Sequence, residues 1–227
     1  MIDDLEKSLP FFKHGAQETP HSRGEFLRPP RAPHYYTYSL AHARNEGHWL
    51  EFGTHDGTTI NLIAEIMRGY GKAKHIIYGF DSFEGLPEDW LKEGDRHDFD
   101  LKGKLPYAAS PNIRFVKGWF KDTIPSFLNK AEKQLKSPQT NVAMIHIDCD
   151  LYSSTVTVLE GLKNKIKPGT VIMFDEINNG GGEYPQYKDH EHKAWQEFSE
   201  KYKVKYNWLA YVKDSTQASL IIRDIQT

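Results

Sequence analysis

The chain of 227 residues contains a single cysteine, Cys149, and therefore cannot form an internal disulfide. Because disulfides are common in oxidising compartments, this scarcity predicts a protein of the reducing cytoplasm. No apolar run approaches the ~20 residues that a membrane-spanning helix needs, and the polar amino terminus is not typical of a signal peptide. We therefore expect a cytoplasmic protein without a membrane partner.

Clustered basic residues are also missing. The formal net charge is −2, and no long run of lysine or arginine occurs. A protein needs such clusters to neutralise the phosphates of nucleic acid, so we expect no nucleic-acid partner. The length suits one large domain with a sizeable core.

Two common nucleotide-binding signatures are absent, namely G-x-G-x-x-G and G-x-x-x-x-G-K-[ST]. In their place stands the stretch Glu51-Phe52-Gly53-Thr54-His55-Asp56-Gly57. It predicts a strand end, a glycine turn and the start of a helix. Glycine lacks the Cβ that would keep a ligand from the backbone, and a helix start offers free N–H groups. We expect a nucleotide-like cofactor at this turn, an ordinary tight turn being the alternative.

Apolar runs and helical stripes alternate from residue 48 onward. We expect strands at 49–52, 75–80, 113–116, 142–148 and 170–174, helices beginning near 58, 125, 154 and 189, and a final strand pair at 206–212 and 218–222. This order predicts an α/β fold, Rossmann-like and doubly wound, with a mostly parallel sheet. Residues 1–45 show no clean periodicity and are predicted to form an arm or lid before a domain at 46–227.

The carboxyl ends of the first two strands narrow the choice of cofactor. Glu51 would repel a pyrophosphate but suits a ligand that carries an ammonium group. Asp81, which ends the second strand, is placed to accept hydrogen bonds from ribose hydroxyls. S-Adenosylmethionine combines a ribose and a positive charge with no phosphate. It is therefore the expected cofactor.

Carboxylates also follow two later strands. Asp148, Asp175 and Glu176 stand at the ends of neighbouring parallel strands and could converge on one hard cation. All-oxygen ligands favour Mg²⁺ or a similar divalent ion over zinc. Such an ion would lower the pKa of an acceptor hydroxyl and orient it. The alternative is that this acidic cluster only caps strands and a helix.

Four residues are candidates for proton transfer or substrate contact. Asp150 is the first candidate for the general base and His146 the second, and Asp148 and Asp150 could exchange the roles of ligand and base. His55 lies in the cofactor turn and could face the substrate.

Three segments carry a resemblance to a known family. They are residues 51–57 (EFGTHDG), 79–87 (GFDSFEGLP) and 146–155 (HIDCDLYSST). In these segments the chain resembles the class I S-adenosylmethionine-dependent methyltransferases, and more narrowly the macrocin O-methyltransferase family, which methylates deoxysugars of macrolides. The acidic residues after the fourth and fifth strands also resemble those that hold magnesium in catechol-type methyltransferases.

This resemblance implies a seven-stranded sheet that ends in an antiparallel hairpin, and an acceptor hydroxyl on a sugar-like small molecule or natural product. It also implies a set of residues around the methyl donor, with the ribose on Asp81 and the adenine near Gly118. The set comprises Glu51, Gly53, Thr54, Gly57, Thr58, Asp81, Ser82, Phe83, Gly118, Trp119 and Asp148. The alternatives are an NAD(P)-dependent or other nucleotide-using enzyme on the same fold, or a non-catalytic binding protein. A homodimer is a further expectation.

Overall fold

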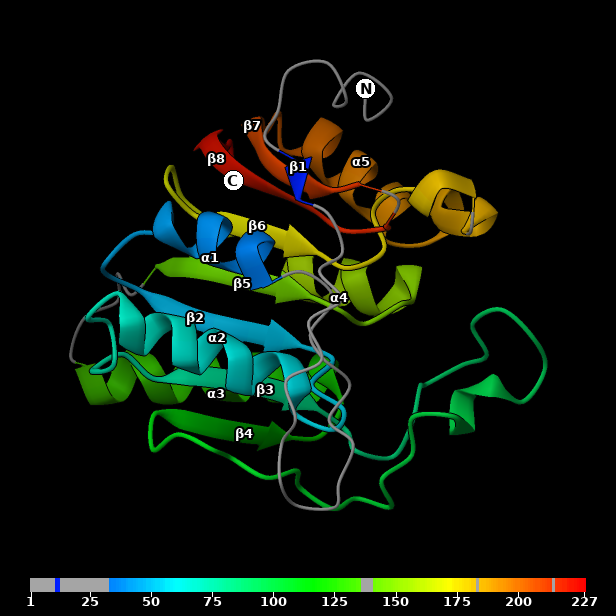
Figure 1. Ribbon diagram of the computed structural model, residues 1–227, viewed down its shortest axis with the longest axis horizontal. Helices are drawn as coiled ribbons and strands as arrows, with labels where there is room; N and C mark the ends of the chain where they lie inside the picture. Colours follow the sequence, from blue (N-terminus) through cyan, green and yellow to red (C-terminus); the bar gives the residue numbers. More distant parts are fainter. Residues whose placement is uncertain (1–10, 13–32, 136–140, 183, 214) are drawn as a thin grey trace.

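The computed structural model describes residues 11–12, 33–135, 141–182, 184–213 and 215–227. In these ranges, eight strands form one sheet in the order β1-β7-β8-β6-β5-β2-β3-β4 (Figure 1). The strands are β1 (Phe11–Phe12), β2 (His48–Phe52), β3 (Ile77–Asp81), β4 (Ile113–Lys117), β5 (Val142–Ile147), β6 (Val171–Phe174), β7 (Lys205–Val212) and β8 (Ala218–Asp224).

Helices cover both faces of this sheet. They are α1 (Pro33–Ala41), α2 (Thr58–Gly69), α3 (Phe120–Leu135), α4 (Tyr152–Leu162) and α5 (Glu191–Lys201), with 3-10 turns η2 (Asp95–His97), η3 (Gly180–Gly182) and η4 (Pro185–Asp189). Helices α1 and α2 lie on one face, and α3, α4 and α5 lie on the other (Figure 1). Buried side chains of α1 and α2 share one core, and those of α3, α4 and α5 share another. Each described helix is too short or too polar to cross a membrane.

The predicted sheet is confirmed. Strands β2 to β6 are parallel, and β8 pairs antiparallel with both β6 and β7. All six residues of β5 are buried, as expected for a strand that helices cover on both faces. The two-residue strand β1 adds an eighth member beside β7, within the segment predicted to be an arm.

Helix α1 lies within residues 1–45, where the sequence shows no clean periodicity and an arm or lid is predicted. Pro33 occupies the first helical position, where its missing N–H leaves no intrahelical bond unmade. Tyr35 and Tyr36 are 0% and 2% exposed and pack in the same core as α2. These tyrosines supply the buried face that a search for aliphatic periodicity overlooks. Residues 1–10 and 13–32 of the predicted arm lie outside the described residues.

Helix α3 begins earlier than predicted. The sequence pattern placed its start near Pro125, but the helix starts at Phe120 and contains the proline. The carbonyl of Trp119 accepts hydrogen bonds from the N–H groups of Asp122 and Thr123, both at 3.0 Å. The first turn therefore closes before the chain reaches Pro125.

Candidate functional site

A cavity of about 510 Å³ lies at the carboxyl ends of β2, β3 and β5. Its volume falls within the roughly 300–1,000 Å³ of small-molecule sites. The predicted site residues that line it are Gly53, Thr54, His55, Asp81, Ser82, Trp119, Asp148 and Asp150. The parallel register brings these residues together, because Phe52 of β2 pairs with both Phe80 of β3 and Ile147 of β5.

Gly53 allows the ends of β2 and β5 to meet. Its φ is +88°, and a Cβ at this position would lie 1.5 Å from the carbonyl oxygen of Asp148. The N–H of Asp148 in turn donates to the carbonyl of Phe52 at 2.9 Å. Only glycine fits between these two strand ends. The turn therefore sets the position of Asp148 as well as the wall of the cavity.

Asp81 is fixed by the backbone around it. Its Oδ2 accepts the N–H groups of Thr54 at 2.9 Å and His55 at 2.8 Å, and its Oδ1 accepts that of Phe83 at 2.6 Å. A carboxylate accepts about four hydrogen bonds, so Asp81 retains capacity for about one more. Asp81 lines the cavity, so a bound molecule could donate this remaining hydrogen bond.

Several residues predicted to contact the cofactor do not line the cavity: Glu51, Gly57, Thr58, Phe83 and Gly118. Glu51 is fully buried, and its Oε1 lies 3.1 Å from Nδ1 of His146 on the neighbouring strand. Phe83 packs against Phe115, with ring centroids 6.0 Å apart. Glu51 therefore meets an imidazole instead of the cavity, and Phe83 contributes its backbone N–H to Asp81 instead of its ring.

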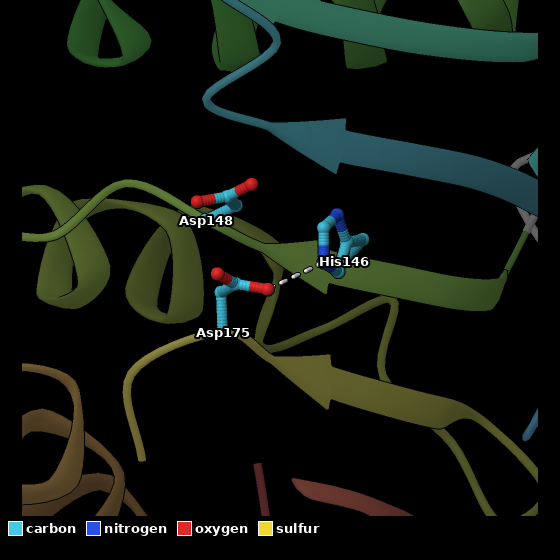
Figure 2. A group of neighbouring side chains, drawn as sticks. All are labelled: His146, Asp148 and Asp175. Atoms are coloured by element: carbon cyan, nitrogen blue, oxygen red, sulfur yellow. Dashed lines mark ion pairs between the residues drawn. The ribbon is translucent and has the colours of Figure 1, made fainter. Parts of the chain in front are cut away.

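The carboxylates after β5 and β6 form two groups of possible metal ligands. One comprises His146, Asp148 and Asp175 (Figure 2), and the other Asp148, Asp150 and Glu176; in each, one ligand atom per residue lies within 4.8 Å of the others. The predicted set of Asp148, Asp175 and Glu176 is divided between them, and Asp148 belongs to both. His55 lies in the turn after β2 and belongs to neither group. Its ring centroid is 5.5 Å from that of Phe99.

Burial and the repulsion of neighbouring carboxylates raise the pKa of Asp148, Asp150 and Glu176. Burial, followed by the charges of Asp175 and Asp150, raises the pKa of Asp148 well above its usual range. Burial and Asp175 raise the pKa of Asp150 to about 7. Burial and Asp175 also raise the pKa of Glu176. A divalent cation would reverse this penalty, because it favours the charged form of every neighbour.

Sequence reasoning missed Glu191, which belongs to the same cluster. It begins α5, is fully buried, and accepts the N–H of Glu176 at 3.0 Å and that of Cys149 at 3.4 Å. It thereby connects the segments that follow β5 and β6. A signal was present, since Glu191 stands three and four residues before the buried Ala194 and Trp195, on the apolar face of the helix.

Unpaired buried atoms support a cation in this cluster. Among the described residues, Nε2 of His146 and Oε2 of Glu176 have no hydrogen-bond partner, although both atoms are inaccessible to solvent. Buried polar atoms usually find partners, so two unpaired ones among crowded carboxylates suggest a ligand. Oxygen ligands in this number suit a hard divalent ion.

The raised pKa of Asp150 predicts how stability depends on pH in the metal-free protein. The unfolded chain releases this proton near pH 3.8, whereas the folded protein retains it until about pH 7. The free energy of unfolding should therefore decrease as pH rises from about 4 to about 7, by on the order of a few kcal/mol. Asp150→Asn should make this decrease smaller. Urea unfolding at a series of pH values, with chelator present, measures it; an equal slope in variant and wild type would contradict the prediction.

Comparison with known proteins identifies the family. The model of the macrocin O-methyltransferase (TylF) family matches residues 37–208. A 4′-O-methyltransferase of Streptomyces olivaceus that acts on 8-demethyl-8-(2,3-dimethoxy-alpha-L-rhamnosyl)-tetracenomycin-C is 29% identical over 150 residues, which is 57% of this chain and 52% of that protein. The chain thus spans about half the length of the curated relatives it matches.

Solved structures share the fold. The calicheamicin methyltransferase CalS11 superposes with a TM-score of 0.58 at 21% identity, covering 83% of this chain and 76% of that one. The methyltransferase MycE of the mycinamycin pathway, in complex with Mg and SAH, gives 0.50 at 13% identity, covering 85% and 49%. With three quarters of its length matched by the family model, this chain belongs to the macrocin O-methyltransferase family.

Proposed function

We propose that the protein is an S-adenosylmethionine-dependent O-methyltransferase, assisted by Mg²⁺ or a similar divalent cation. Its acceptor would be a hydroxyl of a sugar-like small molecule or natural product. The observation that carries the proposal is the juxtaposition of a cofactor-sized cavity with a buried cluster of carboxylates at one sheet edge. The Streptomyces olivaceus relative, whose acceptor is a rhamnosyl-bearing tetracenomycin, supports this acceptor class.

The residues around the turn would hold the methyl donor. Asp81 offers a fixed carboxylate to the ribose, and Trp119 contributes an aromatic wall on which the adenine could stack. S-Adenosylmethionine would supply a methyl group bound to a positively charged sulfur. An oxygen nucleophile would attack the methyl carbon in line and displace the sulfur. Such a reaction depends mainly on alignment, which can contribute ~7–11 kcal/mol. The MycE structure, which contains SAH and Mg, supports the choice of both cofactors.

The acidic cluster would prepare the acceptor hydroxyl. Asp148, Asp175 and Glu176 would hold the cation, which lowers the pKa of a hydroxyl that it binds. Asp150 lines the cavity two residues from Asp148, where its carboxylate could accept the proton of an acceptor hydroxyl. We therefore assign Asp150 as the general base and Asp148 as the ligand.

Calorimetric titration tests the cofactor directly. S-Adenosylhomocysteine should bind with measurable heat, whereas NAD and NADP should give none at the same concentrations. Binding of a dinucleotide in place of S-adenosylhomocysteine would favour the oxidoreductase alternative. Binding of S-adenosylhomocysteine without methyl transfer to a broad panel of glycosides and hydroxylated natural products would favour a non-catalytic protein.

Asp81→Asn should weaken binding of S-adenosylhomocysteine by about 10- to 100-fold. The change removes the negative charge that would accept a hydrogen bond from the ribose. A hydrogen bond to a charged group contributes about 1.5–3 kcal/mol. Asp98→Asn is the matched control, because Asp98 is an exposed residue of the same connection between β3 and β4. Calorimetry on both variants measures the effect. Equal affinities in the two variants would show that Asp81 does not hold the cofactor.

A further inference from the structure

His146 is a fully buried imidazole between two carboxylates. It lies in β5 directly opposite Glu51 of β2, and its Nδ1 is 3.1 Å from Oε1 of that residue. When Glu51 is ionised, its carboxylate can only accept a hydrogen bond, and Nδ1 donates it. The lone pair of the ring then resides on Nε2.

The Nε2 atom faces the acidic cluster. Within the part of the chain that the structure describes, it has no hydrogen-bond partner, although His146 is 0% exposed. Figure 2 shows that it points toward Asp175, whose Oδ1 lies 3.9 Å away, and Asp148 lies beside both. A lone pair on Nε2 is repelled by the carboxylates of Asp148 and Asp175 unless a cation or a proton donor lies between them.

We propose that His146 is a ligand of the bound cation, through Nε2 and together with Asp148 and Asp175. This inference rests on the proposed function, because it requires that a cation occupies the cluster. Glu51 then has the role of the carboxylate that orients a metal-binding histidine. It would be a positioning residue, which explains why a buried acid begins the cofactor turn without facing the cavity.

The surroundings hold the proposed ligands in place. The ring of Tyr36, from α1, packs edge-on against His146 at 5.6 Å between centroids. Gln217, just before β8, donates from Nε2 to the hydroxyl of Tyr36 at 3.1 Å and also to Oδ1 of Asp175. Nε2 of His146 and Oδ1 of Asp175 are 3.9 Å apart, and with an oxygen of Asp148 they form a group whose atoms all lie within 4.8 Å of one another.

A nitrogen ligand changes the expected choice of metal. Carboxylate and water oxygens alone suit Mg²⁺, whereas imidazole suits transition metals, whose affinity for such sites increases from Mn²⁺ to Co²⁺ and beyond. We therefore expect the protein to bind Mn²⁺ and Co²⁺ more tightly than Mg²⁺. His146→Gln should weaken Mn²⁺ binding by about 10- to 100-fold while changing Mg²⁺ binding less.

The decisive experiment is pulsed electron paramagnetic resonance on the full chain loaded with one equivalent of Mn²⁺. Modulation of the electron spin echo by a directly bound ¹⁴N is expected in the wild type. It should disappear in His146→Gln and persist in His75→Gln. His75 precedes β3 and therefore lies at the amino end of that strand, whereas the acidic cluster lies at the carboxyl ends of the strands. Glu51→Gln, which preserves side-chain volume, should keep the modulation but lower the Mn²⁺ affinity.

The wild-type spectrum alone can overturn the inference, even if His146→Gln does not fold. Bound Mn²⁺ without ¹⁴N modulation would mean that His146 faces a buried water instead of the metal, and would leave the all-oxygen site of the proposed function intact. Modulation that persists in His146→Gln would assign the nitrogen to another histidine. Failure to bind any divalent ion would reject both this inference and the cation in the proposed function.

Discussion

Asp175→Asn is expected to reduce methyl transfer by about 10³-fold or more while S-adenosylhomocysteine still binds. Asp175 is a proposed cation ligand, and a bound cation contributes several kcal/mol to charge stabilisation, of which each 1.36 kcal/mol is tenfold in rate. Its side chain is absent from the lining of the cofactor cavity, so cofactor affinity should change little. Asparagine has nearly the same shape and can still accept the hydrogen bond from Gln217.

Labelled methyl transfer to the acceptor panel, alongside calorimetry, measures both effects. Asp224→Asn is the matched control, because Asp224 ends β8 and pairs with Lys205 at 3.5 Å on the surface. It should leave both quantities unchanged. Undiminished activity in Asp175→Asn, also in the presence of chelator, would show that no cation at this cluster assists the reaction.

Gly53→Ala should be the most destabilising single-methyl change at the site. The added Cβ would lie 1.5 Å from the backbone oxygen of Asp148, and a φ of +88° is strained for alanine. Because the atoms that obstruct the Cβ belong to the backbone, no side-chain movement can make room, and the ends of β2 and β5 would have to separate. We expect a loss of about 3 kcal/mol or more in the free energy of unfolding, together with weaker binding of the cofactor.

Gly69→Ala is the control for the same chemical change. Gly69 ends α2, and a Cβ there would lie more than 4 Å from every other atom of the described residues that it could contact. Alanine should therefore be neutral or stabilise the protein slightly. Urea unfolding of both variants makes the comparison. Similar stabilities for the two variants would show that the strand ends at Gly53 tolerate a side chain.

Most of the strands and helices can be predicted from local sequence patterns. The apolar run of β5 and the spacing of Ile60, Ile63, Ala64 and Met67 in α2 predict their elements because burial repeats with the period of each structure. The alignment of Asp81 and Asp148 at one edge follows from parallel topology. These features depend on residues close together in the chain or on general rules of sheet connection.

The contacts across the sheet could not be predicted in this way. The pairing of Glu51 with His146 depends on the register of β2 against β5, which are neighbours in space but 95 residues apart at this pair. The sequence shows an acid beside a glycine turn, and either a cofactor contact or a buried partner is consistent with that pattern. Helix α1 was missed for a similar reason, because its tyrosines become a core only after α2 and β7 assemble beneath them.

Transfer of a labelled methyl group tests the central claim most directly. The protein, loaded with a divalent cation, would be incubated with methyl-labelled S-adenosylmethionine and a panel of glycosides and hydroxylated natural products, and the products analysed by mass spectrometry. We predict a labelled methyl ether on a hydroxyl of at least one sugar-like acceptor, and none after removal of the cation by chelator. Transfer to nitrogen or carbon, equal transfer in chelator, or no transfer to any acceptor would contradict the proposed function.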